Sequence, residues 1–265
     1  MTRARPGSRH GLGNMARLVR KGLGLHTETH GQGSPVLLTH GYGATCRMWD
    51  EQIEAFTDRF RLIVWDLPGH GQSDPPDDRV SPASVADIMR AILDKAGAER
   101  AVVGGLGLGA SLSLRFWRAW PDRVRGLILI GAMPGLRGGT ARALWNARAM
   151  AQAGALERDG LDALEGGAEA DPRMHADAAA LAGAARRLLP RNDSEMLPDL
   201  AAVATPTLIL VGGEDKPNLS AAAHMARVMP NARLEVVPRA NHAVTLHKPG
   251  AANAAIQGFL SRLPP

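Results

Sequence analysis

The sequence predicts an α/β protein built on a mostly parallel β-sheet with helices on both faces. Two observations predict this class. Short apolar runs rich in Val, Ile and Leu recur along the chain, and longer amphipathic stretches separate them. Strands buried on both faces by crossover helices have this composition, whereas half-exposed strands alternate polar with apolar residues. A chain of 265 residues is long enough to bury a large core of this kind.

Strands and helices are expected to alternate over most of the chain. Residues 16–30 should form an antiparallel pair that turns at the sequence KGLG. The central strands are expected at 35–40, 61–66, 100–105, 126–131, 206–211 and 233–238. Helices are expected at about 47–57, 82–97, 108–119, 218–229 and 250–262. Pro121 and Pro230 end two of these helices, because proline cannot continue a helix.

Residues 133–203 interrupt this alternation. They are rich in alanine, contain no convincing strand, and show helical stretches near 140–157 and 172–188. An insertion of this length at the carboxyl end of a strand is expected to be a helical lid rather than a loose loop. The predicted organisation is a flexible basic N-terminus at 1–15, an α/β core at 16–132 and 204–265, and a helical lid at 133–203.

The formal charge of +5 comes from one end of the chain. Residues 1–22 carry six basic residues and no acidic one, which leaves 25 basic and 26 acidic residues for the remainder. A frayed basic terminus explains this distribution, so no nucleic-acid partner is expected. No apolar run approaches the roughly 18 residues of a membrane helix, so no membrane partner is expected. The N-terminus lacks the apolar segment of a secretory signal, which favours a cytoplasmic protein. We expect the protein to be either a monomer or a homodimer.

Characteristic motifs follow the expected strands in a fixed order. They are HGYG (His40–Gly43), DLPGHGQSD (Asp66–Asp74), GLGLG (Gly105–Gly109), VGGED (Val211–Asp215) and RANH (Arg239–His242). Together they resemble the α/β-hydrolase fold family over about residues 16–262. The closest resemblance is to its bacterial branch of small esterases, enol-lactone hydrolases and carbon–carbon bond hydrolases. The GLGLG frame has the spacing of the G-x-S-x-G nucleophile elbow, with Gly107 at the position of the serine.

The elbow requires a strand to turn into a helix within a few residues. Gly105 and Gly109 should allow the backbones of strand and helix to approach closely. The helix N-terminus then directs backbone N–H groups at whatever lies beside residue 107. The resemblance implies an oxyanion hole formed by the amide of Leu108 and by a second amide near Tyr42. Neither donor depends on a side chain, so glycine at 107 should leave both intact.

The resemblance also assigns an acid and a base. Asp215 follows one late strand, where the family places its orienting carboxylate, and His242 follows the last strand, where the family places its imidazole. The order of nucleophile, acid and histidine is that of the α/β hydrolases. A carboxylate that holds an imidazole in one tautomer gives a general base that titrates near neutral pH. His70 is expected to be structural, and His10, His175 and His224 are expected to be surface residues without function.

Glycine at 107 supplies no nucleophile. Ser111 and Ser113 lie outside the G-x-S-x-G frame, and Cys46, the single cysteine, is better explained as a small packing residue. Three accounts stay open. Gly107 replaces a serine in what was a serine hydrolase, or His242 and Asp215 activate water in hydrolytic or lyase-type chemistry, or the protein binds a small molecule without converting it.

The expected substrate is a small, largely apolar ester, lactone or related carbonyl compound, and no metal or organic cofactor is expected. Its pocket should lie between the lid and the sheet. The expected pocket walls are Tyr42, Met133, Trp145 and Met150.

Overall fold

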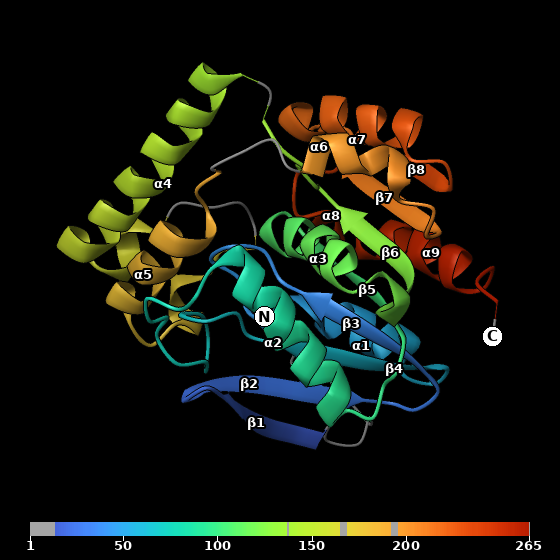
Figure 1. Cartoon of the computed structure of the whole chain (residues 1–265), viewed down its shortest axis with the longest axis horizontal. Coiled ribbons are helices and arrows are strands. Elements are labelled where there is room, and N and C mark those ends of the chain that lie inside the picture. The colour runs from blue at the N-terminus through green and yellow to red at the C-terminus, as the bar shows by residue number, and fades with distance from the viewer. Residues whose placement is uncertain (1–13, 137, 165–168, 192–195, 265) are drawn as a thin grey trace, which may run out of the picture.

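The computed structural model describes residues 14–136, 138–164, 169–191 and 196–264, which form one sheet flanked by helices (Figure 1). The strands are β1 (Asn14–Arg20), β2 (Leu23–His30), β3 (Ser34–Thr39), β4 (Phe60–Trp65), β5 (Ala101–Leu106), β6 (Val124–Ile130), β7 (Thr207–Gly212) and β8 (Ala232–Val237). Their spatial order is β1-β2-β4-β3-β5-β6-β7-β8. Strand β2 runs antiparallel to β1 and β4, and all other neighbours are parallel, which confirms the predicted class.

The helices lie close to their predicted positions. The α-helices are α1 (Asp50–Phe56), α2 (Pro82–Lys95), α3 (Leu108–Ala119), α4 (Gly139–Asp159), α5 (Ala178–Leu188), α6 (Met196–Asp199), α7 (Lys216–Val228), α8 (Val244–His247) and α9 (Pro249–Leu260). The short 3-10 helices are η1 (Cys46–Trp49), η2 (Pro121–Arg123), η3 (Leu161–Ala163), η4 (Pro172–Met174) and η5 (Leu200–Ala202). The helical stretch predicted at 172–188 is two helices, η4 and α5. Asp177 begins α5, because its side chain accepts a hydrogen bond from the Ala179 amide at 2.8 Å. Among the described residues, no helix has the length and apolar character that a membrane span requires.

Two hydrophobic cores lie on opposite faces of the sheet. Leu37, Ile63 and Val103 face the core that helices α2, α3 and α7 cover. Their neighbours along each strand, such as Leu38 and Val64, face the core covered by α1, α8 and α9. Successive residues of a strand point to opposite faces, so a strand with a core on each side is apolar throughout. This explains the lack of polar alternation in the sequence.

The helical insertion follows β6 and stands beside the sheet (Figure 1). Helices α4 and α5 pack on each other through a small cluster that includes Ala153, Leu156 and Leu181. Residues 196–203, which were predicted to belong to the insertion, contribute Met196, Leu200 and Val203 to the main core. Their helical spacing of four and three residues places these side chains on one face, which accounts for the burial.

The strand-to-helix turn at Gly107 has the geometry of a nucleophile elbow. Gly107 has φ +54° and ψ −105°, between the end of β5 and the start of α3. A Cβ at Gly105 would lie 2.2 Å from the carbonyl oxygen of Thr39, and one at Gly109 would lie 2.1 Å from the same oxygen. The predicted close approach of strand and helix is therefore confirmed, and no larger residue fits at either position.

Gly109→Ala should destabilise the fold by about 3 kcal/mol, because the new methyl group would have to displace backbone rather than a flexible side chain. Urea denaturation followed by circular dichroism measures this change. Gly250→Ala in α9 is the matched control: no heavy atom lies within 4 Å of its added Cβ, so its stability should stay equal or rise. Equal stability of the two variants would contradict the close-approach argument.

Candidate active site

A cavity of about 450 Å³ lies beside the carboxyl ends of the central strands and the insertion. Most of the predicted site residues line it: Tyr42, Gly107, Leu108, Met133, Trp145, Asp215 and His242. Met150, the remaining predicted wall, does not line this cavity. Its side chain is exposed, and its sulfur lies 3.7 Å from the Arg186 guanidinium. The neighbouring Ala149 faces the cavity instead, because α4 turns Met150 toward solvent.

Asp215 and His242 form a fixed pair at this cavity. Asp215 directly precedes α7, and His242 lies in the loop between β8 and α8. The Nδ1 atom of His242 lies 2.7 Å from Oδ2 of Asp215, so Nδ1 carries the proton and Nε2 is left to accept one. Asn218 donates its side-chain N–H to both oxygens of Asp215 at 2.9 Å each, which fixes the carboxylate. Sequence reasoning missed Asn218, although its position one helical turn after Asp215 was a usable signal.

The environment shifts the pKa of both partners. Burial alone would raise the pKa of Asp215, but the hydrogen bonds from His242 and Asn218 outweigh it and lower this pKa below its usual value. Burial alone would lower the pKa of His242. The hydrogen bond to Asp215 and the negative charges of Glu169 and Asp215 outweigh burial, so the pKa of His242 is raised. Asp215 therefore stays ionised, and His242 is a stronger base than an ordinary imidazole.

His242 lies between two glycines. A Cβ at Gly107 would have two side-chain neighbours, Nε2 of His242 at 3.0 Å and Cε1 at 3.6 Å. A Cβ at Gly131 would lie 2.6 Å from Cε1 and 2.8 Å from Nδ1 of the same ring. Gly131 therefore leaves room for the ring, and a small polar side chain at 107 would meet the proton-accepting nitrogen. Sequence reasoning did not single out Gly131.

The two expected oxyanion donors border the same space. Leu108 is the first residue of α3, where backbone N–H groups have no partner within the helix. Tyr42 follows β3 and lines the cavity. Its phenol donates a hydrogen bond to the carbonyl of Leu181 in α5 at 3.1 Å, and burial raises its pKa, so it stays neutral. The Tyr42 side chain thus contacts α5 in the insertion. The role predicted for Tyr42 in the oxyanion hole concerns only its backbone amide.

Buried histidines hold the loop that carries Tyr42. Nε2 of His40 accepts a hydrogen bond from the Leu67 amide at 2.9 Å, and burial lowers the pKa of His40 to about 3. His70 contacts the rings of His40 and Tyr42 and does not line the cavity. His175 is not the surface residue that was expected. It is buried and bonds the carbonyl of Gly43 at 2.8 Å, because the insertion folds back over this loop.

The other candidate nucleophiles do not face the cavity. The Ser111 hydroxyl lies 3.2 Å from the carbonyl oxygens of Gly107 and Met133 and accepts a hydrogen bond from Arg191 at 3.0 Å. The Ser113 hydroxyl donates to the Gly109 carbonyl at 2.8 Å. Neither serine, nor Cys46, lines the cavity.

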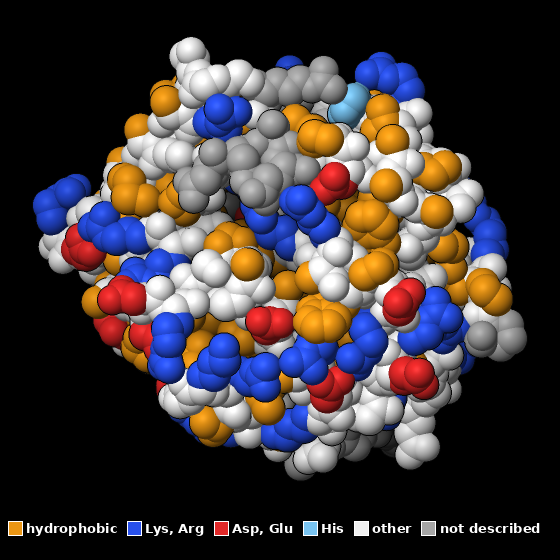
Figure 2. All heavy atoms as spheres, viewed as in Figure 1, with side chains coloured by type: hydrophobic (Ala, Val, Ile, Leu, Met, Phe, Trp, Pro, Cys, Tyr) orange, Lys and Arg blue, Asp and Glu red, His pale blue; other side chains and the backbone are white. Residues whose placement is uncertain are grey.

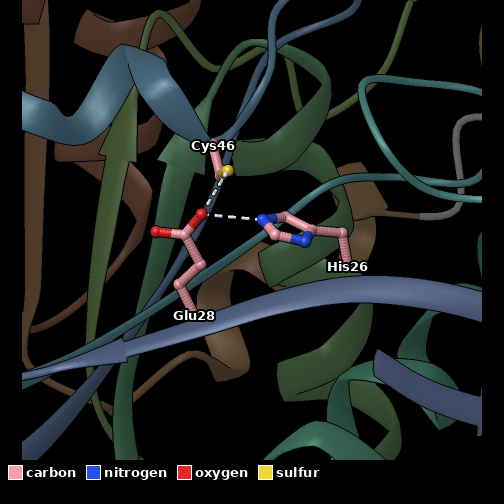
Figure 3. A group of neighbouring side chains, drawn as sticks. All are labelled: His26, Glu28 and Cys46. Atoms are coloured by element: carbon pink, nitrogen blue, oxygen red, sulfur yellow. Dashed lines mark hydrogen bonds and ion pairs between the residues drawn. The ribbon is translucent and has the colours of Figure 1, made fainter. Parts of the chain in front are cut away.

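Away from the cavity, His26, Glu28 and Cys46 bring possible metal ligands within 4.8 Å of one another. Figure 3 shows the histidine and the thiol both directed at the carboxylate of Glu28. Glu28 also forms an ion pair with Arg47, which balances its charge. Burial raises the pKa of the Cys46 thiol, whereas metal binding needs the thiolate. This set fits a metal poorly and instead joins β2 to η1.

Charged residues of the insertion also line the cavity, namely Arg148, Glu169 and Arg191. Glu169 packs beside Gly41, since a Cβ added at Gly41 would lie 3.7 Å from the Cγ atom of Glu169. Its buried Oε2 has no hydrogen-bond partner among the described residues. Sequence reasoning missed these residues, because no motif marks them in the alanine-rich insertion.

Glu169→Gln should lower the pKa of His242, because the substitution removes a negative charge that stabilises the imidazolium. NMR titration of the His242 ring measures this pKa without any need for turnover. The His242 imidazole becomes protonated as the pH falls through its pKa. Because the pKa should be lower in the variant, the imidazole should stay neutral, and so act as a base, down to a lower pH. Glu157→Gln, on the exposed surface of α4, is the control and should leave the titration unchanged. An unaltered or raised pKa in Glu169→Gln would refute the assigned coupling.

Comparison with known proteins places this site in a family. The model of the alpha/beta hydrolase family matches residues 36–255. A solved thermophilic esterase from Thermogutta terrifontis is 27% identical, with a TM-score of 0.81 over 94% of this chain and 98% of that chain. The 2-(acetamidomethylene)succinate hydrolase of Mesorhizobium japonicum is 28% identical over 261 residues, which are 89% of this chain and 91% of that enzyme.

A third relative matches more locally. A pimeloyl–acyl-carrier-protein methyl ester esterase of Nitrosomonas europaea is 33% identical over 110 residues, which are 42% of each chain. The alignment with this enzyme thus spans about two fifths of its length, whereas the family match extends over most of the chain. The chain therefore belongs to the alpha/beta hydrolase family.

Proposed function

We propose that this protein hydrolyses a small carboxylic ester or lactone with a water molecule that the His242–Asp215 pair activates. One observation carries the proposal: the space that a side chain at Gly107 would occupy is bordered by Nε2 of His242, 3.0 Å from the Cβ position. The amide of Leu108 begins the helix beside this space. A proton acceptor and a hydrogen-bond donor thus converge where a nucleophile and a carbonyl group would meet.

The cavity suits a ligand of this size and polarity. Its volume of about 450 Å³ lies within the range of small-molecule sites. Leu108, Met133, Trp145 and Leu189 supply apolar walls. The similarity to an esterase, a 2-(acetamidomethylene)succinate hydrolase and a methyl ester esterase supports a carbonyl substrate.

The reaction follows from the positions of these groups. Nε2 of His242 takes a proton from water as the water oxygen adds to the carbonyl carbon. The oxyanion accepts hydrogen bonds from the amides of Leu108 and Tyr42, while Asp215 stabilises the imidazolium. The tetrahedral intermediate then expels the alkoxide, which takes the proton from His242. Acid and alcohol leave, and the protein is unchanged; with glycine at 107 no covalent intermediate forms there.

Glycine at 107 makes this route slow. Loss of the serine from a Ser-His-Asp site costs about 10⁶ in kcat, while roughly 10³–10⁴ over the uncatalysed rate persists from the oxyanion hole and binding. The rest of the site is compatible with a serine. The positive φ of Gly107 is the conformation that the nucleophile of an elbow adopts, and a Cβ there would require only a small shift of His242.

Gly107→Ser should raise the rate of hydrolysis of p-nitrophenyl acetate at least about 100-fold, because the hydroxyl would lie beside Nε2 of His242. Release of p-nitrophenol measures the rate. Gly107→Ala is the matched control: it introduces the same Cβ and backbone strain without a hydroxyl, so it should show no gain. No gain in Gly107→Ser with the fold preserved would contradict a site organised around a serine-like nucleophile.

His242→Ala tests the water route in the otherwise unchanged chain. The protein should hydrolyse p-nitrophenyl acetate slowly, and the substitution should remove this activity, because it removes the group that takes the proton from water. Product formation over a long incubation measures both rates. If the variant hydrolyses the ester as fast as the parent, the imidazole is not the base; if the parent binds esters but forms no product, the protein is a binding protein.

A further inference from the structure

A second cavity lies on the outer side of the active-site wall. Its volume is about 430 Å³, and it lies between the segment that follows β6 and helix α7. Met133, Pro134 and Leu136 form one side, and Leu197 of α6 adds to it. The mechanism above uses none of this space.

One face of α7 forms the floor of this cavity. Pro217, Ser220, Ala221, His224 and Arg227 line it and follow each other at helical spacing, so they form a single stripe. The stripe begins next to Asp215, at the start of α7, and ends at Arg227. From Pro217 to Arg227 the helix rises about 15 Å along its axis. The cavity is therefore an elongated groove that leads away from the catalytic pair.

The groove adjoins the active-site cavity directly. Met133 and Pro217 line both cavities, so these two side chains are the partition between them. Methionine is unbranched and has three rotatable bonds, which lets it adapt to a chain that passes beside it. A ligand that reacts at His242 would enter the groove only if the Met133 side chain moves aside, which its flexibility allows.

The walls of the groove indicate what it binds. Apart from Ser220, the residues near the partition are apolar: Pro134, Leu136, Leu197 and Ala221. Polarity increases at the far end, where the Arg227 guanidinium lies 3.0 Å from Nδ1 of His224. Figure 2 shows basic and histidine side chains next to hydrophobic ones over α7, at the upper right of the view. The groove thus offers an apolar path of limited length that ends at a polar surface.

We propose that this groove binds a linear aliphatic chain attached to the reacting carbonyl group, so that the preferred substrates are medium-chain esters rather than acetyl esters. The inference rests on the proposed function for the position of the carbonyl group beside His242. Binding of the aliphatic chain in the groove requires only that the carbonyl or carboxylate end of the ligand occupies the active-site cavity. Each methylene buried against such walls should raise affinity about fourfold, which corresponds to about 0.8 kcal/mol.

Isothermal titration with sodium butanoate and sodium decanoate tests the groove without any need for turnover. Decanoate should bind at least about tenfold more tightly, the gain expected once two or more methylenes enter the groove. Ala221→Trp fills the groove and should remove most of this gain while butanoate binding stays unchanged. Leu136→Asn, which makes the opposite wall polar, should weaken decanoate binding in the same way.

Ala254→Trp is the matched control, since Ala254 is exposed on α9 and lines neither cavity. It should bind both acids as the parent does. Equal affinity for the two acids in the parent, or full retention of the decanoate gain in Ala221→Trp, would overturn the proposal. Chain-length-dependent binding by a protein that forms no product from p-nitrophenyl acetate would uphold the groove and refute the proposed function; turnover that depends on His242 without chain-length-dependent binding would refute the groove alone.

Discussion

The site depends on the close approach of α3 to the centre of the sheet. Gly105 and Gly109 both lie against the carbonyl oxygen of Thr39, at distances that no Cβ could occupy. Between these two glycines, Gly107 adopts a positive φ. Gly107 and Leu108, the first residue of α3, both line the cavity beside His242. The position of the backbone at 107 thus depends on this packing and not on a side chain at 107.

The same reasoning explains why the site tolerates glycine at the nucleophile position. His242 is held by Asp215 from one side and has Gly131 behind it, so its orientation needs no hydroxyl at 107. Asp215 is in turn fixed by Asn218. A base that is oriented independently of its proton donor can serve a serine, a water molecule or a substrate C–H group. The structure therefore fixes the position of the base and leaves the identity of the proton donor open.

The sequence predicted the core of the fold and the contact between Asp215 and His242, because both follow local rules. Parallel strands end at a common edge, so Asp215 and His242 were expected to meet although 27 residues separate them. Features that depend on long-range packing were not predictable in this way. His175 belongs to the insertion and is buried only because that segment folds back on Gly43. Glu169 lies in no motif, and its role arises from where the insertion places it.

The insertion therefore governs the parts of the chemistry that the core leaves open. The negative charge of Glu169 raises the pKa of His242, which has two opposing consequences. The neutral form of His242 is a stronger base, but a smaller fraction of the His242 side chains is in the neutral form near pH 7. For a water nucleophile, whose pKa of about 15.7 makes proton removal difficult, a stronger base is an advantage. For an activated ester at mildly acidic pH, the smaller neutral fraction is a disadvantage. A carboxylate at this position thus favours a nucleophile that needs strong activation, which is the situation that glycine at 107 creates.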